Sequence, residues 1–136
     1  MIESVHRRRV FVTKGENTMK VIVLAPNEKP TVKGIDSELE SMQGVVDGMI
    51  EAIYPFEDKV ALVCNEEGKL CGLDPNFALV MNKRVMDVIV GTCFICGLGE
   101  EDFCSLSDEL CEKYLNLFEC PMGFIGNGYF VPAYEI

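Results

Sequence analysis

Two cysteines, Cys93 and Cys96, are the most obvious candidates for chemistry in this 136-residue chain. A C-x-x-C pair binds zinc or cycles between dithiol and disulfide when it lies on a loop or at the start of a helix. Here the pair lies in an apolar run of β type, where side chains three positions apart point to opposite faces of a strand. No second C-x-x-C accompanies it, and the only histidine is His6. We therefore expect two buried structural thiols and no metal site; stoichiometric zinc in the purified protein would contradict this.

A second group of candidates surrounds an acidic turn at residues 65–76. Carboxylate and amide oxygens together suit a hard divalent cation, so the alternative function is a metal-dependent enzyme that uses the acids of a 66–76 hairpin. Their spacing matches no known ion-binding loop, and ordinary turn chemistry also accounts for these residue types. The candidate ligand or turn residues are Asn65, Glu66, Glu67, Asp74 and Asn76.

Motifs for covalent catalysis and for cofactor binding are missing from the sequence. Without a histidine after His6, neither a Ser/His/Asp nor a Cys/His set can form in the body of the chain. No GxGxxG motif or P-loop occurs, and the segment from Gly97 to Gly99 is too short to bind a phosphate. We therefore predict no catalytic residue and no cofactor, and enzymatic activity is the less favoured interpretation.

The densest acidic region of the chain extends from residue 100 to residue 119. One interpretation is a solvated loop followed by a solvated helix face. The other is a phosphate-like surface that occupies a basic groove of a partner protein. The net charge of −10 at pH 7 repels nucleic-acid backbones and disfavours direct nucleic-acid binding. The candidate partner-binding residues are Glu100, Glu101, Asp102, Asp108, Glu109 and Glu112.

The first 18 residues differ from the remainder because they are basic. They contain an arginine triplet at residues 7–9 and Lys14, and Met19 then begins a strand-like run. The segment from Lys14 to Glu16 can be encoded by codons that contain a ribosome-binding core a short distance before Met19. We therefore expect residues 1–18 to be a non-native or disordered extension. The alternative is a basic arm that touches nucleic acid or an anionic surface.

No part of the sequence has the pattern of a secretory signal or of a membrane span. The head has no apolar h-region, and the longest apolar run, residues 85–98, is interrupted by Asp87, Gly91 and Thr92. Seven cysteines, an odd number, favour reduced thiols. We expect a cytoplasmic protein that makes no contact with a membrane.

The first half of the chain predicts a β-hairpin, a helix and further strands. Residues 20–25 and 31–35 are β-rich runs separated by turn residues. Ser37 and Glu40 fit a capping box for an amphipathic helix that ends near Gly48. The predicted strands that follow are residues 50–54, residues 59–64 with both faces covered, and residues 69–73 after a turn closed by a left-handed Gly68.

The second half predicts another central strand, a helix and a terminal hairpin. The central strand covers residues 85–96 with a bend at Gly91, and residues 77–81 fit either a short helix or a strand. Ser107 caps a helix that Pro121 stops, and Leu110, Tyr114, Leu117 and Phe118 form its apolar face. Residues 124–134, around Gly126 to Gly128, form the hairpin. The fold class is α+β: a single domain over 19–136 with two amphipathic helices on a mixed or mostly antiparallel sheet.

Several segments together resemble domain-of-unknown-function family 3846, small proteins carried by phages and integrative elements of Gram-positive bacteria. The resemblance lies in residues 19–23, 39–43, 50–55, 64–69, 72–73, 76, 87–91 and 105–107. This chain has Leu73-Asp74-Pro75-Asn76 where the family pattern has Leu-Pro-x-Asn, so the turn there differs. Because the family has no established activity, the resemblance carries over no catalytic residue. It implies an accessory protein of a mobile element that acts inside a bacterial host.

We therefore predict a small acidic binding protein without chemistry of its own. Its partner would be a protein of the host or of the element, and counter-defence or host modulation is the sharper version of this prediction. A sensor of a small ligand is a further alternative that only a pocket would support. The sequence leaves the oligomeric state open.

Overall fold

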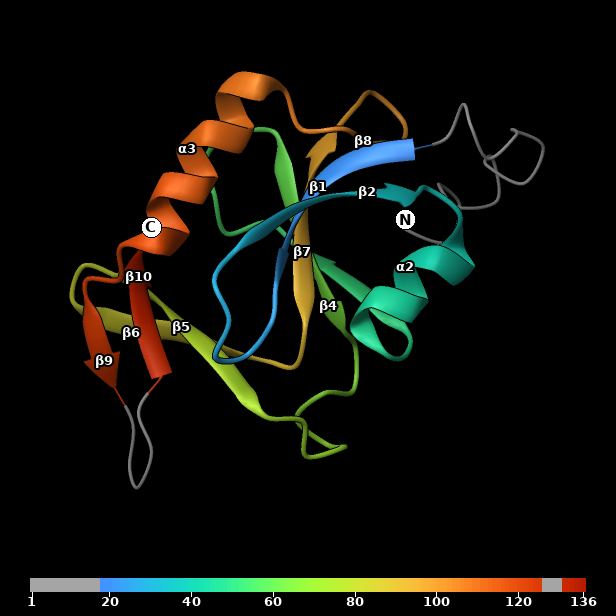
Figure 1. The fold of residues 1–136 in the computed structure, drawn as a ribbon. Helices are drawn as coiled ribbons and strands as arrows, with labels where there is room; N and C mark the ends of the chain where they lie inside the picture. Colours follow the sequence, from blue (N-terminus) through green and yellow to red (C-terminus); the bar gives the residue numbers. More distant parts are fainter. Residues whose placement is uncertain (1–17, 126–130) are drawn as a thin grey trace.

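The computed structural model describes residues 18–125 and 131–136, and its strands form two β-sheets (Figure 1). Strands account for 46% of the described residues and helices for 18%. The two expected helices are both present, but the fold is mostly β and the expected α+β class was too helical a description. The extension expected over residues 1–18 falls almost entirely outside the described part.

The larger sheet, sheet A, is antiparallel throughout and has two fully buried strands at its centre. The strand order is β2-β1-β7-β4-β3, and β8 also pairs with β7. The strands are β1 (Thr18–Leu24), β2 (Thr31–Asp36), β3 (Ile50–Ile53), β4 (Val60–Asn65), β7 (Cys93–Leu98) and β8 (Phe103–Cys104). The apolar runs of β4 and β7 are buried on both faces, which confirms the prediction of central strands there.

The smaller sheet, sheet B, is mixed. Its strand order is β6-β5-β10-β9, and β10 pairs with β5 in parallel while the other pairs are antiparallel. The strands are β5 (Pro75–Met81), β6 (Arg84–Val90), β9 (Gly123–Ile125) and β10 (Val131–Glu135). The expected terminal hairpin is therefore confirmed as β9 and β10, whereas its turn at Gly126 to Gly128 lies outside the described residues.

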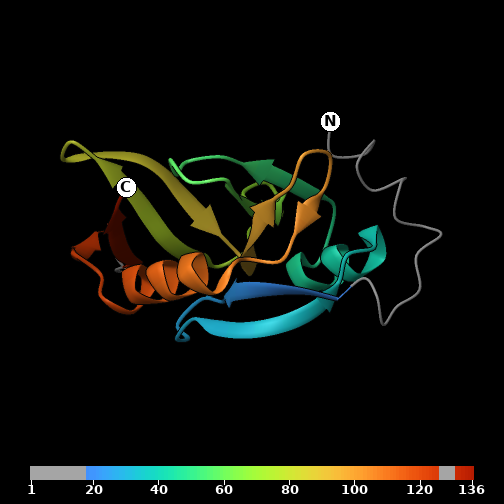
Figure 2. The same ribbon diagram turned by 90° about the horizontal axis from the view of Figure 1, so that it is seen from above.

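The two helices cover opposite faces of sheet A (Figures 1 and 2). Helix α2 (Leu39–Val46) inserts Met42 and Val46 between side chains of one face of the sheet. Helix α3 (Asp108–Glu119) and the inner face of sheet B pack against the other face. Alternate residues of a strand point to opposite faces, so β4 gives residues 61 and 63 to the first core and residues 60, 62 and 64 to the second.

Several features predicted between residues 66 and 96 were wrong. Residues 66–72 form successive turns, so the strand at 69–73 and the 66–76 hairpin do not exist. Leu70, which a return strand would bury, is 88% exposed. The run at 85–96 is two strands, because Gly91 adopts a φ of +73° and sends β6 into sheet B and β7 into sheet A. The left-handed glycine near the acidic turn is Gly72 and not Gly68.

The predicted ends of α3 and the predicted end of α2 near Gly48 are confirmed, whereas the predicted start of α2 is not. Ser107 accepts a hydrogen bond from the Leu110 N–H at 3.1 Å, as an N-cap serine should. In α2 the N-cap residue is Glu38, which makes no side-chain cap hydrogen bond, so the capping box predicted for Ser37 and Glu40 was wrong. The chain leaves α2 through the C-cap residue Asp47, which takes the left-handed conformation directly before Gly48.

Candidate functional site

The two cysteines of the C-x-x-C motif lie on opposite sides of sheet A. Cys93 belongs to the core shared with α3, and Cys96 belongs to the core under α2. Burial raises the pKa of both thiols well above the ordinary value, which keeps them protonated and unreactive. Among residues 18–125 and 131–136, no group of three or more His, Cys, Asp or Glu side chains is arranged to hold a metal ion.

Of the candidates at residues 65–76, Asn65 has a structural role, because its side chain holds two segments of the chain together. Its Nδ2 donates to the carbonyl oxygens of Val46 and Asp47, both at 3.1 Å, and its Oδ1 accepts from the Glu67 N–H at 2.7 Å. These bonds tie the end of α2 to the turn after β4. Glu66, Glu67 and Asp74 lie exposed in the turns that replace the predicted hairpin.

Asn76 is the member of this group that lies inside the protein. Its side chain is nearly buried, and its Nδ2 donates to the carbonyl oxygens of Leu24 and Gly91, both at 2.9 Å. The amide thereby joins the end of β1, the start of β5 and the point where the chain passes from sheet B to sheet A. Since both Nδ2 protons are used, the carboxamide oxygen is the part of the side chain that can accept a further hydrogen bond.

The predicted acidic surface is divided between two elements. Glu100, Glu101 and Asp102 lie in the connection between β7 and β8, and the other three acids lie on α3. Asp108 pairs with Lys20, and this hydrogen bond lowers the pKa of the Asp108 carboxyl. Glu109 and Glu112 are exposed on the outer side of α3.

Helical spacing extends these two exposed acids into a stripe. Residues three and seven positions apart lie on the same face of a helix, which places Glu119 in line with Glu112 and Glu109. Glu119 is also exposed. We call Glu109, Glu112 and Glu119 the acidic stripe. It runs along α3 and ends at a cleft that the sequence did not predict.

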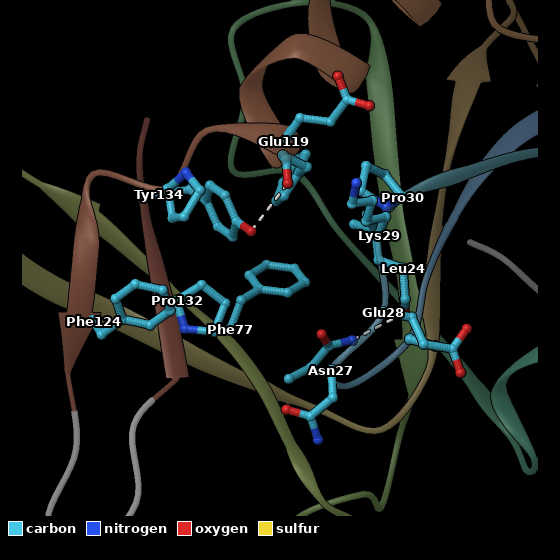
Figure 3. Close-up of a pocket in the computed structure, with 14 residues that line it drawn as sticks. Leu24, Asn27, Glu28, Lys29, Pro30, Phe77, Glu119, Phe124, Pro132 and Tyr134 are labelled. Carbon is cyan, nitrogen blue, oxygen red and sulfur yellow. Dashed lines mark hydrogen bonds between the residues drawn. The ribbon is translucent and has the colours of Figure 1, made fainter.

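This cleft has a volume of about 550 Å³ and lies where the two sheets and the end of α3 meet. We call it the aromatic cleft. One wall in Figure 3 carries Phe77, Phe124, Pro132 and Tyr134 from sheet B, and the other carries Leu24, Asn27, Glu28, Lys29 and Pro30 from the end of β1 and its connection to β2. The rest of the lining consists of Ala25, Asn76 and, at the end of α3, Phe118, Glu119 and Pro121.

The rings in the cleft hold one another in place. Phe118 and Tyr134 have centroids 4.6 Å apart, and Phe77 lies 5.1 Å from Phe118 and 5.7 Å from Tyr134. The Tyr134 hydroxyl donates to the Phe118 carbonyl oxygen at 3.1 Å, a bond visible in Figure 3. Burial raises the pKa of Tyr134, so the hydroxyl remains a donor at neutral pH. The cleft is therefore preformed before any molecule enters it.

Phe124 differs from the other rings because 61% of its surface is exposed. It lies on β9 directly across from Pro132 of β10, so both rings face the same side of sheet B. The sequence feature that could have indicated this site is a phenylalanine that lies close to prolines. Local patterns do not reveal the cleft because it combines three regions that are far apart in the chain: residues 24–30, residues 76–77, and residues 118–124 with 132–134.

A scan of family models places the chain in a known family. Residues 19–119 match DUF3846, a domain of unknown function. The chain belongs to this family, as its resemblance suggested. Searches of the curated proteins and of the solved structures find no match. The matched region ends before β9, so Phe124, Pro132 and Tyr134 of the aromatic cleft lie beyond it.

No helix in the described part of the chain has the length and apolar character needed to cross a membrane. Both helices instead carry polar residues on their outer faces and bury an apolar face against sheet A.

Proposed function

We propose that this protein works by binding a segment of another protein in the aromatic cleft. The observation that carries the proposal is the cleft itself, with a largely exposed phenylalanine on a base of interlocked aromatic rings. Aromatic side chains fixed by their neighbours offer a large contact area at a small entropic cost, which is why they dominate binding hot spots. The cleft brings no nucleophile and base together, so its arrangement favours recognition over catalysis.

The acidic stripe supports a partner of opposite charge. Glu109, Glu112 and Glu119 lead along α3 to the cleft, and the chain carries a net charge of −10. A basic partner would be steered toward this side of the molecule, with an association rate that falls as salt is added. Of the acidic residues predicted to bind a partner, we therefore propose that those on α3 do so.

The cellular setting is a further part of the proposal. We infer from the family resemblance an accessory protein of a phage or mobile element that acts in the cytoplasm of a bacterial host, on a host or element protein. Counter-defence or host modulation is the process that such a setting favours. Phage or conjugation genes beside its own gene would support this setting, whereas a metabolic operon would contradict it.

A small-ligand sensor is the second candidate, and the cleft volume of about 550 Å³ favours it because ligand pockets occupy about 300–1,000 Å³. Against it stands the exposure of Phe124, since small-ligand pockets enclose most of their ligand. The metal-dependent enzyme has less support, because the hairpin that it requires does not form.

Selection from a displayed library of random linear peptides tests the binding proposal. Peptides enriched on the full-length chain should lose at least about tenfold in affinity for the Phe124→Ala variant. The matched control is Met122→Ala, because Met122 is exposed to a similar extent (57%) but does not line the cleft. Enriched peptides that bind both variants equally would rule out the aromatic cleft as the binding site.

A further inference from the structure

We infer that the segment bound in the aromatic cleft contains proline in the polyproline II conformation, with an arginine or lysine close to the prolines. This inference rests on the proposed binding function and adds the chemical class of the partner. It follows from three properties of the cleft: its ring-lined walls, the short strand at its border and the charges on its rim.

The walls offer flat rings to a ligand that has rings of its own. Phe124 is the exposed ring of this wall and lies beside the half-buried Pro132, whereas Tyr134 and Phe118 are buried behind them and form the base of the cleft. Pro30 faces them from the opposite wall (Figure 3). Grooves lined with aromatic residues bind polyproline II segments because these segments are already extended and lose little entropy when they dock.

The strand at the border of the cleft disfavours recognition by strand addition. β9 is the edge strand of sheet B, and within the described part of the chain it has three residues, Gly123 to Ile125. Strand addition depends on a row of main-chain hydrogen bonds, and these three described residues supply few of them. A polyproline II segment needs fewer such partners because its prolines have no N–H. Asn27 and Asn76 both line the cleft, and their carboxamide oxygens are acceptors for N–H groups of the bound segment.

The charged residues at the rim of the cleft favour an arginine or lysine beside the prolines of the bound segment. Glu28 comes from the β1–β2 connection and Glu119 from the end of α3, so a carboxylate is present on two sides of the cleft. Lys29 is the one cationic residue among the described residues that line the cleft, so the two carboxylates give the rim a net negative charge. An arginine suits such carboxylates because its guanidinium binds them with two parallel hydrogen bonds.

Synthetic peptides labelled with tryptophan provide the measurement. The chain contains no tryptophan, so the tryptophan emission comes from the peptide alone, and its change as protein is added reports binding. A peptide with two prolines and one arginine should bind the full-length protein. Replacing both prolines with alanine, or the arginine with glutamate, should each weaken binding by about tenfold or more. Glu119→Lys should reduce the preference for arginine, whereas the matched Glu40→Lys, at an exposed position of α2 outside both the cleft and the acidic stripe, should leave it nearly unchanged.

The outcomes separate this inference from the binding proposal. If the peptides selected from the random library depend on Phe124 but lack proline, or bind as well after proline is replaced, the inference is overturned and the proposed function stands. If peptides are selected but none of them depends on Phe124 for binding, both this inference and the proposed function are contradicted. If a folded partner binds at Phe124 while every linear peptide fails, the polyproline class is again excluded.

Discussion

The two helices cover opposite faces of the same sheet, yet they are stabilised in different ways. α3 has a serine cap, acids in its first turn and a buried face of Cys111, Tyr114 and Phe118 within a cluster of aromatic rings. α2 is shorter, has no side-chain cap, contains Gly44 in its interior and buries only Met42 and Val46. Because of this difference, we expect α3, which borders the aromatic cleft, to be locally more stable than α2 on the other face of sheet A. A site that must be preformed lies beside the more rigidly held helix.

The largest test of this contrast removes one buried side chain from each helix. Phe118→Ala should lower the free energy of unfolding by about 4 kcal/mol, because it creates a cavity and removes three ring contacts. Met42→Ala should cost about 3 kcal/mol, since a methionine leaves a smaller cavity. Urea unfolding followed by circular dichroism measures both values. A larger loss for Met42→Ala would reverse the proposed ranking of the two helices.

The next effect comes from the helix caps. Ser107→Ala should destabilise the protein by about 1 kcal/mol, because the Leu110 N–H loses its acceptor. Ser107→Asp serves as the control and should retain most of the stability, since aspartate caps as well as serine and favours the helix N-terminus. If alanine and aspartate behave alike at this position, the cap contributes nothing to the difference between the helices.

A substitution in α2 should act in the opposite direction. Gly44→Ala should stabilise the protein by about 0.5–1 kcal/mol, because glycine is a poor helix former and an added Cβ meets no atom within 4 Å. Hydrogen exchange of the α2 amides should slow in the variant, while exchange in α3 stays the same. Loss of stability would mean that α2 is not limited by its local sequence.

The smallest effect concerns the side of α3 that faces residue 58. Asp58 accepts hydrogen bonds from Lys113 Nζ at 2.6 Å and from the Tyr114 hydroxyl at 2.7 Å, and these bonds hold the pKa of its carboxyl below the ordinary value. A lowered folded-state pKa means that the carboxylate stabilises the fold above the unfolded-state pKa of about 4. This contribution is lost as the pH falls through the folded-state value.

Asp58→Asn should therefore lower stability at neutral pH and lose its effect in acid. Unfolding curves of the wild type and the variant, measured from pH 7 down to about pH 3, should converge as Asp58 becomes protonated. A difference that stays constant over this range would show that the hydrogen-bond geometry, and not the charge of Asp58, holds α3 against the 55–59 segment.

The sequence predicted those parts of the fold that depend on local patterns. The continuous apolar runs of β4 and β7 identified the centre of sheet A, and Ser107 with Pro121 identified both ends of α3. The sequence could not show that the run at 85–96 serves two sheets, because apolar strands look alike whichever sheet they join. Only the φ of Gly91 and the hydrogen bond from Asn76 to its carbonyl mark the change of sheet.

The candidate site was harder to predict for the same reason. The acids on α3 were found from their density, and Glu109 and Glu112 are indeed exposed. The cleft beside them depends on the parallel pairing of β5 with β10, which no pattern within either strand reveals. Asn76 was singled out for its amide but was assigned to a turn, whereas it is buried between three segments of backbone.

The parallel pairing of β5 with β10 also determines which parts of the molecule can fold first during synthesis. Sheet A and both helices are complete once the ribosome has released residue 119, but Pro132 and Tyr134 of the cleft follow later and must find β5, far back in the chain. Distant pairings of this kind form slowly. A nascent chain can thus hold a folded central sheet while the aromatic cleft is still incomplete, so the cleft closes only after β10 has been made and has paired with β5.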